Sequence, residues 1–236
     1  MMPNVPQKQP VTAPGEGAFR HSLQVARGGF SLTELLVVMA IIAMLASLMG
    51  PTLNSALRGS AMTQGADKIT GVIGIARQTA VTKSQTVEVR FYSYVDPELP
   101  GDSGQCHALQ AFTVSDSNTF TPIMKSQVLP ASVVMTTNPT FSSLLSMSMT
   151  PGSSSGGTNS LATKLPRVGL NYNYTSFQIY RSGSTSLIPT NVWCVTVLDS
   201  SDAAAAGGSS ASLPKNYTTL VIDPYKASVT PYRPSL

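Results

Sequence analysis

The chain has 236 residues, of which 42% are hydrophobic and only 11% are charged, and its formal net charge is +4. The length suits one ordinary domain plus an anchoring segment, and the low charge disfavours a charged helical bundle. Residues 1–29 contribute +2, and residues 30–236 contribute the other +2 from twelve basic and ten acidic side chains. A net charge of +2 spread over residues 30–236 does not predict a basic surface that would bind nucleic acid, so we expect no nucleic-acid partner.

Residues 1–29 form a polar N-terminal segment, rich in Pro and Gly, that ends in two glycines. The next twenty residues, 30–49, carry a single charged side chain, Glu34, among Leu, Ile, Val, Met and Ala. As a helix this stretch would be about 30 Å long, the thickness of a hydrocarbon core. Because the basic residues precede it, the positive-inside tendency predicts a cytoplasmic N-terminus and export of the chain after residue 50.

Three ordinary interpretations of this stretch each leave something unexplained. A cleaved secretory signal has a shorter apolar core, followed by a small-residue site such as residues 46–48. A plain signal anchor explains the length but not Glu34. A buried helix of a soluble protein is rarely apolar on every face for five turns.

The run from Gly29 to Leu35 reads GFSLTEL, and it resembles the prepilin signature of bacterial type IV pilin-like proteins. The resemblance implies that a prepilin peptidase cuts between Gly29 and Phe30 and N-methylates Phe30. It also implies that Glu34 pairs with the methylated amine of a neighbouring subunit during assembly, and that Pro51 kinks the helix. The alternative is that Glu34 has no role in assembly and is tolerated because it lies near the start of the helix, at the membrane interface.

The resemblance implies a structural subunit and no enzyme: a minor pilin or pseudopilin of a type II secretion-like pseudopilus or a type IV pilus. Such a subunit is a single-pass protein of the bacterial inner membrane with a periplasmic domain. Its expected partners are prepilin peptidase, membrane lipid and other pilins, with which it forms a hetero-oligomeric filament. The alternative is a DNA-uptake or ligand-binding minor pilin, whose C-terminal cations would be Lys215, Lys226 and Arg233, interleaved with Asp223.

Two further resemblances, both less specific than the N-terminal signature, point to narrower groups of prepilin-type proteins. Residues 76–81, 87–91 and 177–184 are similar to the GspH/FimT group of minor pseudopilins. The chain resembles still more closely the Verru_Chthon cassette protein D family of prepilin-type proteins.

Beyond Pro51 the apolar pattern becomes amphipathic. Small and apolar residues recur at steps of three and four, which marks one face of a helix: Met62, Ala66, Ile69, Ile73, Ala76 and Ala80. We therefore predict a helix over residues 31–83, bent near residue 51, whose second half packs on a sheet.

From residue 85 the period becomes two, and Val87, Val89 and Phe91 alternate with polar residues as in a half-buried strand. Further strands are predicted at 108–115, 122–129, 131–136, 168–174, 176–181, 191–198, 217–222 and 226–232. Residues 150–158 and 203–210 are low-complexity loops. The predicted fold is α+β: leader 1–29, transmembrane helix 30–50, amphipathic helix 51–83 and antiparallel strand-rich domain 84–236.

The two cysteines, Cys106 and Cys194, permit one disulfide in an exported domain or two separate buried thiols. His107 follows Cys106, but adjacent residues of a strand point to opposite faces, which argues against a joint nucleophilic or metal site.

The chain has no G-x-S-x-G elbow, P-loop or dinucleotide fingerprint, so we expect no catalytic residue, metal or cofactor. Four aromatic residues fit half-buried sheet positions better than a ligand platform: Tyr172, Tyr174, Tyr180 and Trp193.

Overall fold

The computed structural model describes residues 31–99, 101–117, 119–152, 164–203 and 213–234. The chain divides into two compact units, Met1–Leu48 and Met49–Leu236. All of the predicted leader and most of the two low-complexity loops lie outside the described residues.

Helix α1 spans Leu32–Lys83, which confirms the predicted helix over 31–83. Ser31 caps its N-terminus, because the Ser31 Oγ accepts a hydrogen bond from the Glu34 N–H. At the other end Ser84 adopts a φ of 50°, and the N–H groups of Ser84 and Gln85 donate to the carbonyls of Val81 and Ala80. This pattern of two bonds across a left-handed residue is the Schellman motif, which ends the helix although no glycine is present.

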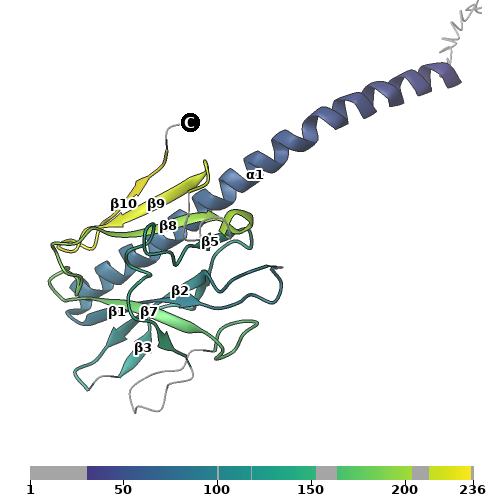
Figure 1. The fold of residues 1–236 in the computed structure, drawn as a ribbon. Helices are drawn as coiled ribbons and strands as arrows, with labels where there is room; N and C mark the ends of the chain where they lie inside the picture. Colours follow the sequence, from purple (N-terminus) through teal and green to yellow (C-terminus); the bar gives the residue numbers. More distant parts are fainter. Residues whose placement is uncertain (1–30, 100, 118, 153–163, 204–212, 235–236) are drawn as a thin grey trace, which may run out of the picture. The chain divides into compact units, whose positions relative to one another are not determined.

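Among the described residues ten strands follow the helix in one sheet, and each of their pairings is antiparallel. Their bounds are β1 Thr86–Ser93, β2 Cys106–Val114, β3 Phe120–Pro122, β4 Gln127–Val128, β5 Val133–Met135, β6 Thr150–Pro151, β7 Asn173–Ile179, β8 Trp193–Asp199, β9 Tyr217–Ile222 and β10 Val229–Tyr232. The sheet order is β10-β9-β8-β5-β2-β1-β7-β6, while β3 and β4 pair with β2 (Figure 1). The α+β fold class is therefore confirmed.

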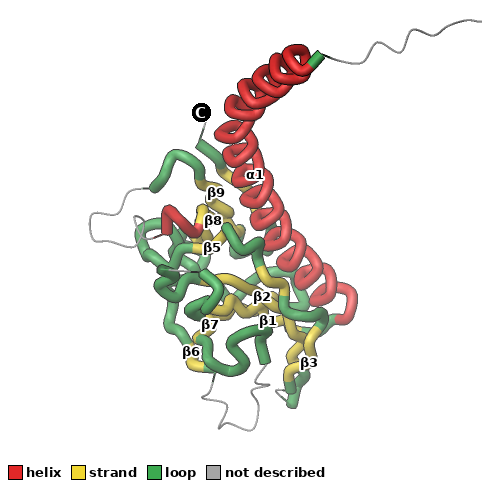
Figure 2. Tube along the Cα trace, turned by 90° about the vertical axis from the view of Figure 1, so that its right-hand side faces the viewer, coloured by secondary structure: helices red, strands yellow, loops and turns green. Residues whose placement is uncertain are grey.

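The second part of α1 lies along the sheet and supplies one side of the main core (Figure 2). All six residues of the predicted stripe are at most 3% exposed, which confirms the amphipathic assignment. They pack against apolar side chains of β1, β2, β5, β7, β8 and β9. The helix approaches the sheet closely at Gly65, where an added Cβ would lie 2.9 Å from the Cγ1 of Val133.

Several strand predictions were wrong in extent. The predicted strand 122–129 is broken: β3 ends at Pro122 and β4 covers only Gln127–Val128, while in between the Gln110 side chain donates a hydrogen bond to the Met124 carbonyl. Residues 168–172 of the predicted strand 168–174 form a turn and irregular structure, and β7 replaces the two strands expected between 168 and 181. The short β6 lies where only a loop was predicted.

Strand β1 was predicted to be half-buried, and this prediction was wrong. Its polar residues are buried as well: Glu88 is 6% exposed, Arg90 2% and Tyr92 0%. The reason is that β1 lies inside the sheet between β2 and β7, and aromatic side chains cover the face away from α1.

Candidate functional site

The residues that the sequence singled out for processing and assembly lie at, or just before, the start of α1 in the sequence. Gly29 and Phe30, the predicted cleavage and methylation residues, lie outside the described residues. Glu34 is described: it occupies the first turn of α1, and its side chain is exposed. An acidic side chain there is favoured by the partial positive charge of a helix N-terminus.

The first unit presents apolar side chains on all sides of α1. Every residue from 31 to 47 is exposed, including Leu32 at 80% and Met44 at 70%. Apolar patches of this extent mark surfaces that are covered by a membrane or by another protein. Glu34 is the one charged residue among residues 31–47.

No helix among the described residues has both the length and the apolarity that a membrane crossing requires. Helix α1 continues through Pro51, while the Pro51 side chain is outside what the structure describes. The transmembrane assignment of residues 30–50 and the kink at Pro51 both stay predictions.

The structure leaves both cysteines as free thiols, so the candidate Cys106–Cys194 disulfide is not formed. Cys106 on β2 faces Met135 on β5, which in turn faces Val197 on β8. Two strand spacings, about 10 Å, therefore separate Cys106 from β8, and Cys194 lies three residues further along that strand. A disulfide needs Cα atoms within about 7 Å, so this fold keeps the thiols apart.

Cys106 and His107 point to opposite faces of β2, as predicted. Cys106 lies in the main core, where burial raises the pKa of its thiol to about 12. His107 lies on the other face, where its Nε2 is 2.8 Å from Asp102 Oδ2 and its ring is 4.9 Å from that of Tyr94. Within the described ranges no group of three or more His, Cys, Asp and Glu side chains gathers in a way that would hold a metal ion.

A buried charged cluster on β1 was missed by the sequence analysis. Arg90 Nε lies 2.6 Å from Glu88 Oε1, and both side chains are less than 10% exposed. The Arg90 guanidinium also lies over the rings of Phe112, Phe120 and Tyr174, at 4.7, 4.6 and 4.7 Å. Spacing by two residues, which places Glu88 and Arg90 on one face of a strand, was the available signal. The cluster has the composition of a structural ion pair stabilised by cation–π contacts.

The aromatic residues are mostly parts of the packing, as predicted. Tyr172 is 6% exposed and meets Tyr92 edge-to-face at 5.0 Å, and Trp193 is 8% exposed. Tyr180 differs, since 40% of it is exposed. Tyr172 and Trp193 therefore belong to the packing of the sheet and not to an open stacking platform.

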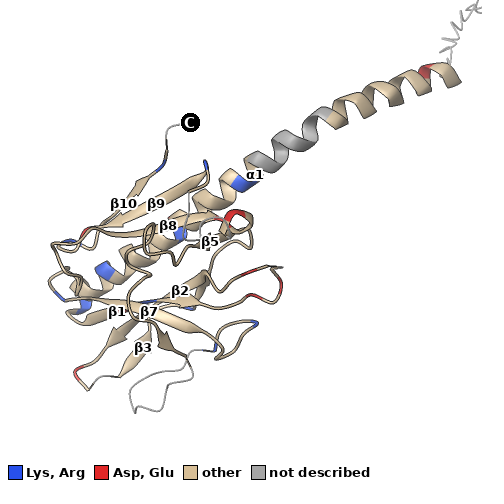
Figure 3. Cartoon of the chain, in the orientation of Figure 1, with Lys and Arg blue, Asp and Glu red and all other residues tan. Residues whose placement is uncertain are grey.

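The cations of the described residues are dispersed. Lys and Arg residues occur on α1, on several loops and near the C-terminal strands, and Asp and Glu residues occur on several other loops (Figure 3). Lys215, Lys226 and Arg233 are among them, and the Arg233 Nη2 donates to Thr63 Oγ1 over 3.1 Å. The distribution gives no support to the DNA-uptake alternative.

Comparison with solved structures finds two similar chains of low identity. The minor pseudopilin EpsH from the Type 2 Secretion System of Vibrio cholerae is 8% identical, with a TM-score of 0.40, over 74% of this chain and 98% of that chain. The type IV minor pilin FimU of Pseudomonas aeruginosa is 10% identical, with a TM-score of 0.38, over 72% of this chain and 86% of that chain. Both scores are too low to carry a functional argument.

No curated protein matches the chain. Residues 26–50 match the family described as "Prokaryotic N-terminal methylation motif". This match covers Gly29, Phe30 and Glu34 and ends one residue before Pro51. The chain therefore carries the prokaryotic N-terminal methylation motif, at the position where its sequence shows the prepilin signature.

Proposed function

We propose that the chain is a prepilin-type minor pilin or pseudopilin, a structural subunit of a type II secretion-like pseudopilus or a type IV pilus. The observation that carries the proposal is the methylation motif over residues 26–50. The apolar, exposed first part of α1 with its lone Glu34 is the kind of surface such a subunit buries in lipid and then in a filament.

Each residue of the motif has a physical part in this function. Gly29 has no side chain, so an extended backbone can enter the groove of a peptidase without a clash. Hydrolysis of the Gly29–Phe30 bond frees the Phe30 amine, which the peptidase then methylates. Glu34 in hydrocarbon costs about 2.5–3.5 kcal/mol, so it requires a partner, and the freed amine of a neighbouring subunit supplies the opposite charge.

This pairing would set the axial register between subunits as they leave the membrane. A buried ion pair contributes more to the choice of one arrangement than to net stability. The role is therefore assembly with other pilins in a hetero-oligomer, without a reaction of the chain's own.

The proposed topology follows from charge and length. Residues 1–29 hold a net charge of +2 and would remain cytoplasmic, residues 30–50 would cross the bacterial inner membrane, and residues 84–236 would fold in the periplasm. The amphipathic part of α1, residues 51–83, would join the membrane segment to the periplasmic domain.

Processing by a prepilin peptidase tests the proposal. We expect coexpression with the peptidase to shorten the wild-type chain on a gel and to leave a Gly29→Val variant at full length. Gly17→Val, which changes a glycine elsewhere in the leader, is the matched control and should be shortened normally. A wild-type chain that keeps its length beside an active peptidase would contradict the proposal.

A further inference from the structure

Four basic residues lie at the end of the second unit where α1 finishes. Arg77 and Lys83 belong to the last two turns of α1, Arg181 follows β7, and Lys226 lies in the hairpin turn between β9 and β10. Figure 3 shows blue segments at this end of α1 and on the turns beside it. We refer to these four residues as the basic end.

The turn after β7 packs against the end of α1. Gly183 adopts a φ of 85°, and its N–H donates to the Tyr180 carbonyl over 2.8 Å, which closes the turn that contains Arg181. An added Cβ at Gly183 would lie 3.9 Å from Arg77 Nε and 3.5 Å from Val81 Cγ2. The Arg77 side chain therefore lies against this turn.

The hairpin that carries Lys226 is held beside the same segment. The N–H and the hydroxyl of Thr185 both donate to the Pro224 carbonyl, over 2.8 and 2.9 Å. Thr185 follows closely after Arg181, and Pro224 comes shortly before Lys226. Residues that are far apart in the sequence thus bring their cations to one end of the unit.

The net positive charge of the second unit belongs to this end. Residues 49–236 contain twelve Lys and Arg and nine Asp and Glu side chains. The basic end and its hairpin hold four of these cations and one acid, Asp223, so that the other eight cations and eight acids balance. Asp116, in the turn between β2 and β3, lies beyond β1 from the turn after β7. Among the described residues, none of the four cations takes part in an ion pair.

The exposed side chains at the basic end are of the types that protein interfaces use. Lys83 has a structural use, since the negative end of a helix dipole favours a cation in the last turn. The other three cations have no such use and are exposed. Beside them Val81 is 48% exposed, Tyr180 40% and Tyr225 68%. Arg and Tyr are enriched in protein–protein interfaces and among the residues that contribute most to binding.

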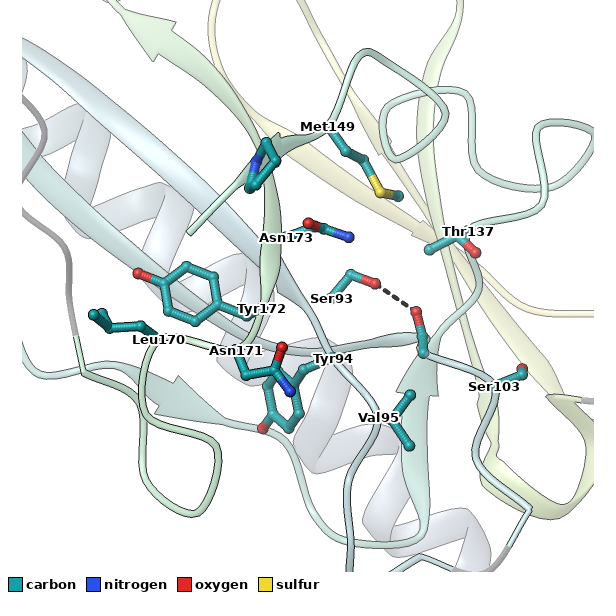
Figure 4. A pocket seen from close by; sticks show the side chains of 12 residues that line it. Ser93, Tyr94, Val95, Ser103, Thr137, Met149, Leu170, Asn171, Tyr172 and Asn173 are labelled. Atoms are coloured by element: carbon teal, nitrogen blue, oxygen red, sulfur yellow. Dashed lines mark hydrogen bonds between the residues drawn. The ribbon is translucent and has the colours of Figure 1, made fainter. Parts of the chain in front are cut away.

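The cleft at the opposite end of β1 and β7 differs in charge (Figure 4). It has a volume of about 730 Å³, and among the described residues its lining, which includes Ser93, Asn171 and Asn173, holds no charged side chain. An anionic partner would form no ion pair there. Charge complementarity therefore favours the basic end as the surface for such a partner.

We infer that the basic end binds an acidic segment of another polypeptide. Arg77, Arg181 and Lys226 pair with its Asp and Glu side chains, and Tyr180 and Tyr225 pack against its apolar ones. Nucleic acid fits less well, because so few cations neutralise few phosphates and bind them weakly. The contact does not involve the N-terminal motif and does not depend on prepilin processing.

Binding of synthetic acidic peptides tests the inference. The full chain, in micelles of an uncharged detergent, is titrated into a panel of fluorescent, end-blocked peptides in which Glu and Leu vary in spacing. Matched peptides carry Gln in place of every Glu. We expect saturable binding of acidic peptides, weakened by added salt, and about tenfold weaker binding of the Gln peptides, since three exposed ion pairs are lost.

Two triple variants separate position from net charge. Combining Arg77→Gln, Arg181→Gln and Lys226→Gln should weaken the binding of acidic peptides about tenfold. The control variant removes the same charge from exposed positions on other loops: Lys125→Gln, Lys164→Gln and Lys215→Gln. It should bind the peptides as the wild type does.

Four results would overturn the inference. They are no saturable binding of any acidic peptide, equal binding of the Gln peptides, equal affinities of the two triple variants, and tighter binding of a single-stranded oligonucleotide that depends on the same three cations.

Discussion

The backbone N–H of Glu34 donates a hydrogen bond to Ser31 Oγ over 3.2 Å, and the Leu35 N–H donates to the Ser31 carbonyl over 3.1 Å. Ser31 and Glu34 thus stand at the two positions of a capping box, S-x-x-E, at the start of α1. The helix begins at Leu32, two residues after Phe30, the residue that processing would make the N-terminus. Four residues along the chain therefore separate the proposed new N-terminus from Glu34, whose carboxylate would bind the amine of a neighbour.

The charge of Glu34 should matter for assembly and not for processing. Glu34→Gln keeps the side-chain shape but cannot neutralise a neighbouring amine. We expect this variant to be cleaved normally and to be depleted from sheared filaments. Asp116→Asn, on an exposed turn far along the chain, should enter filaments at the wild-type level. Normal incorporation of the Glu34→Gln chain would show that the pairing is dispensable.

Two glycines of α1 offer a matched test of the helix–sheet contact. Gly71→Ala meets nothing within 4 Å, so it should raise the free energy of unfolding by roughly 0.5–1 kcal/mol through helix propensity. Gly65→Ala gains the same propensity but places its Cβ 2.9 Å from the Cγ1 of Val133, which is buried in the core. Overpacking of this kind costs about 1–3 kcal/mol, so Gly65→Ala should destabilise.

Urea denaturation of the two glycine variants gives the comparison. The predicted difference between them isolates packing, because the backbone change is identical. Equal stabilisation by both substitutions would contradict the close approach of α1 to β5.

Removing one partner of the Glu88–Arg90 ion pair should reduce the free energy of unfolding more than replacing both partners does. Arg90→Met leaves the Glu88 carboxylate buried without its cation, and such variants lose about 3–5 kcal/mol of stability. The double variant Glu88→Gln, Arg90→Met should recover a large part of that loss. Arg181→Met, on an exposed turn, should stay within about 0.5 kcal/mol of the wild type in the same denaturation measurement.

Stability should fall at alkaline pH because two buried acids resist ionisation. Burial raises the pKa of Cys106 from 9.0 to about 12, and that of Tyr94 from 10.0 to about 12. Above pH 9 the unfolded thiol loses its proton while the folded one keeps it, so the folded state binds more protons and loses stability as pH rises. Each group contributes a slope of at most about 1.4 kcal/mol per pH unit between its two pKa values.

Denaturation midpoints of the wild type and of Cys106→Ala, measured from neutral to strongly alkaline pH, test this effect. The variant should lose the part of the decline that begins near pH 9 and keep the part that begins near pH 10. Cys194→Ala is the control, with the wild-type profile expected. A Cys106→Ala profile parallel to the wild type would contradict the assignment.

The sequence predicted best those elements that a local pattern of apolar residues specifies. From Met62 to Ala80 apolar and small residues recur with the helical period over five turns, and this pattern predicted both the second half of α1 and the face that it buries. Strand β1 was located by its alternation. Its burial was not predictable, because the covering of its polar face by Phe112, Phe120 and Tyr174 depends on strands distant in sequence.

The two cysteines show the same dependence on long-range pairing. The disulfide could be neither proposed nor rejected from spacing, since the intervening β5 that separates β2 from β8 is just three residues long. The N-terminal motif needed no such pairing, because it is read by a peptidase as a linear segment.

Mass spectrometry of the N-terminal peptide of the mature chain, isolated from cells that contain an active prepilin peptidase, tests the central claim most directly. The account predicts a chain that begins at N-methylated Phe30 and lacks residues 1–29. A mature chain that retains those residues, or that begins after the apolar stretch as a secretory cleavage near residue 48 would leave it, would contradict it.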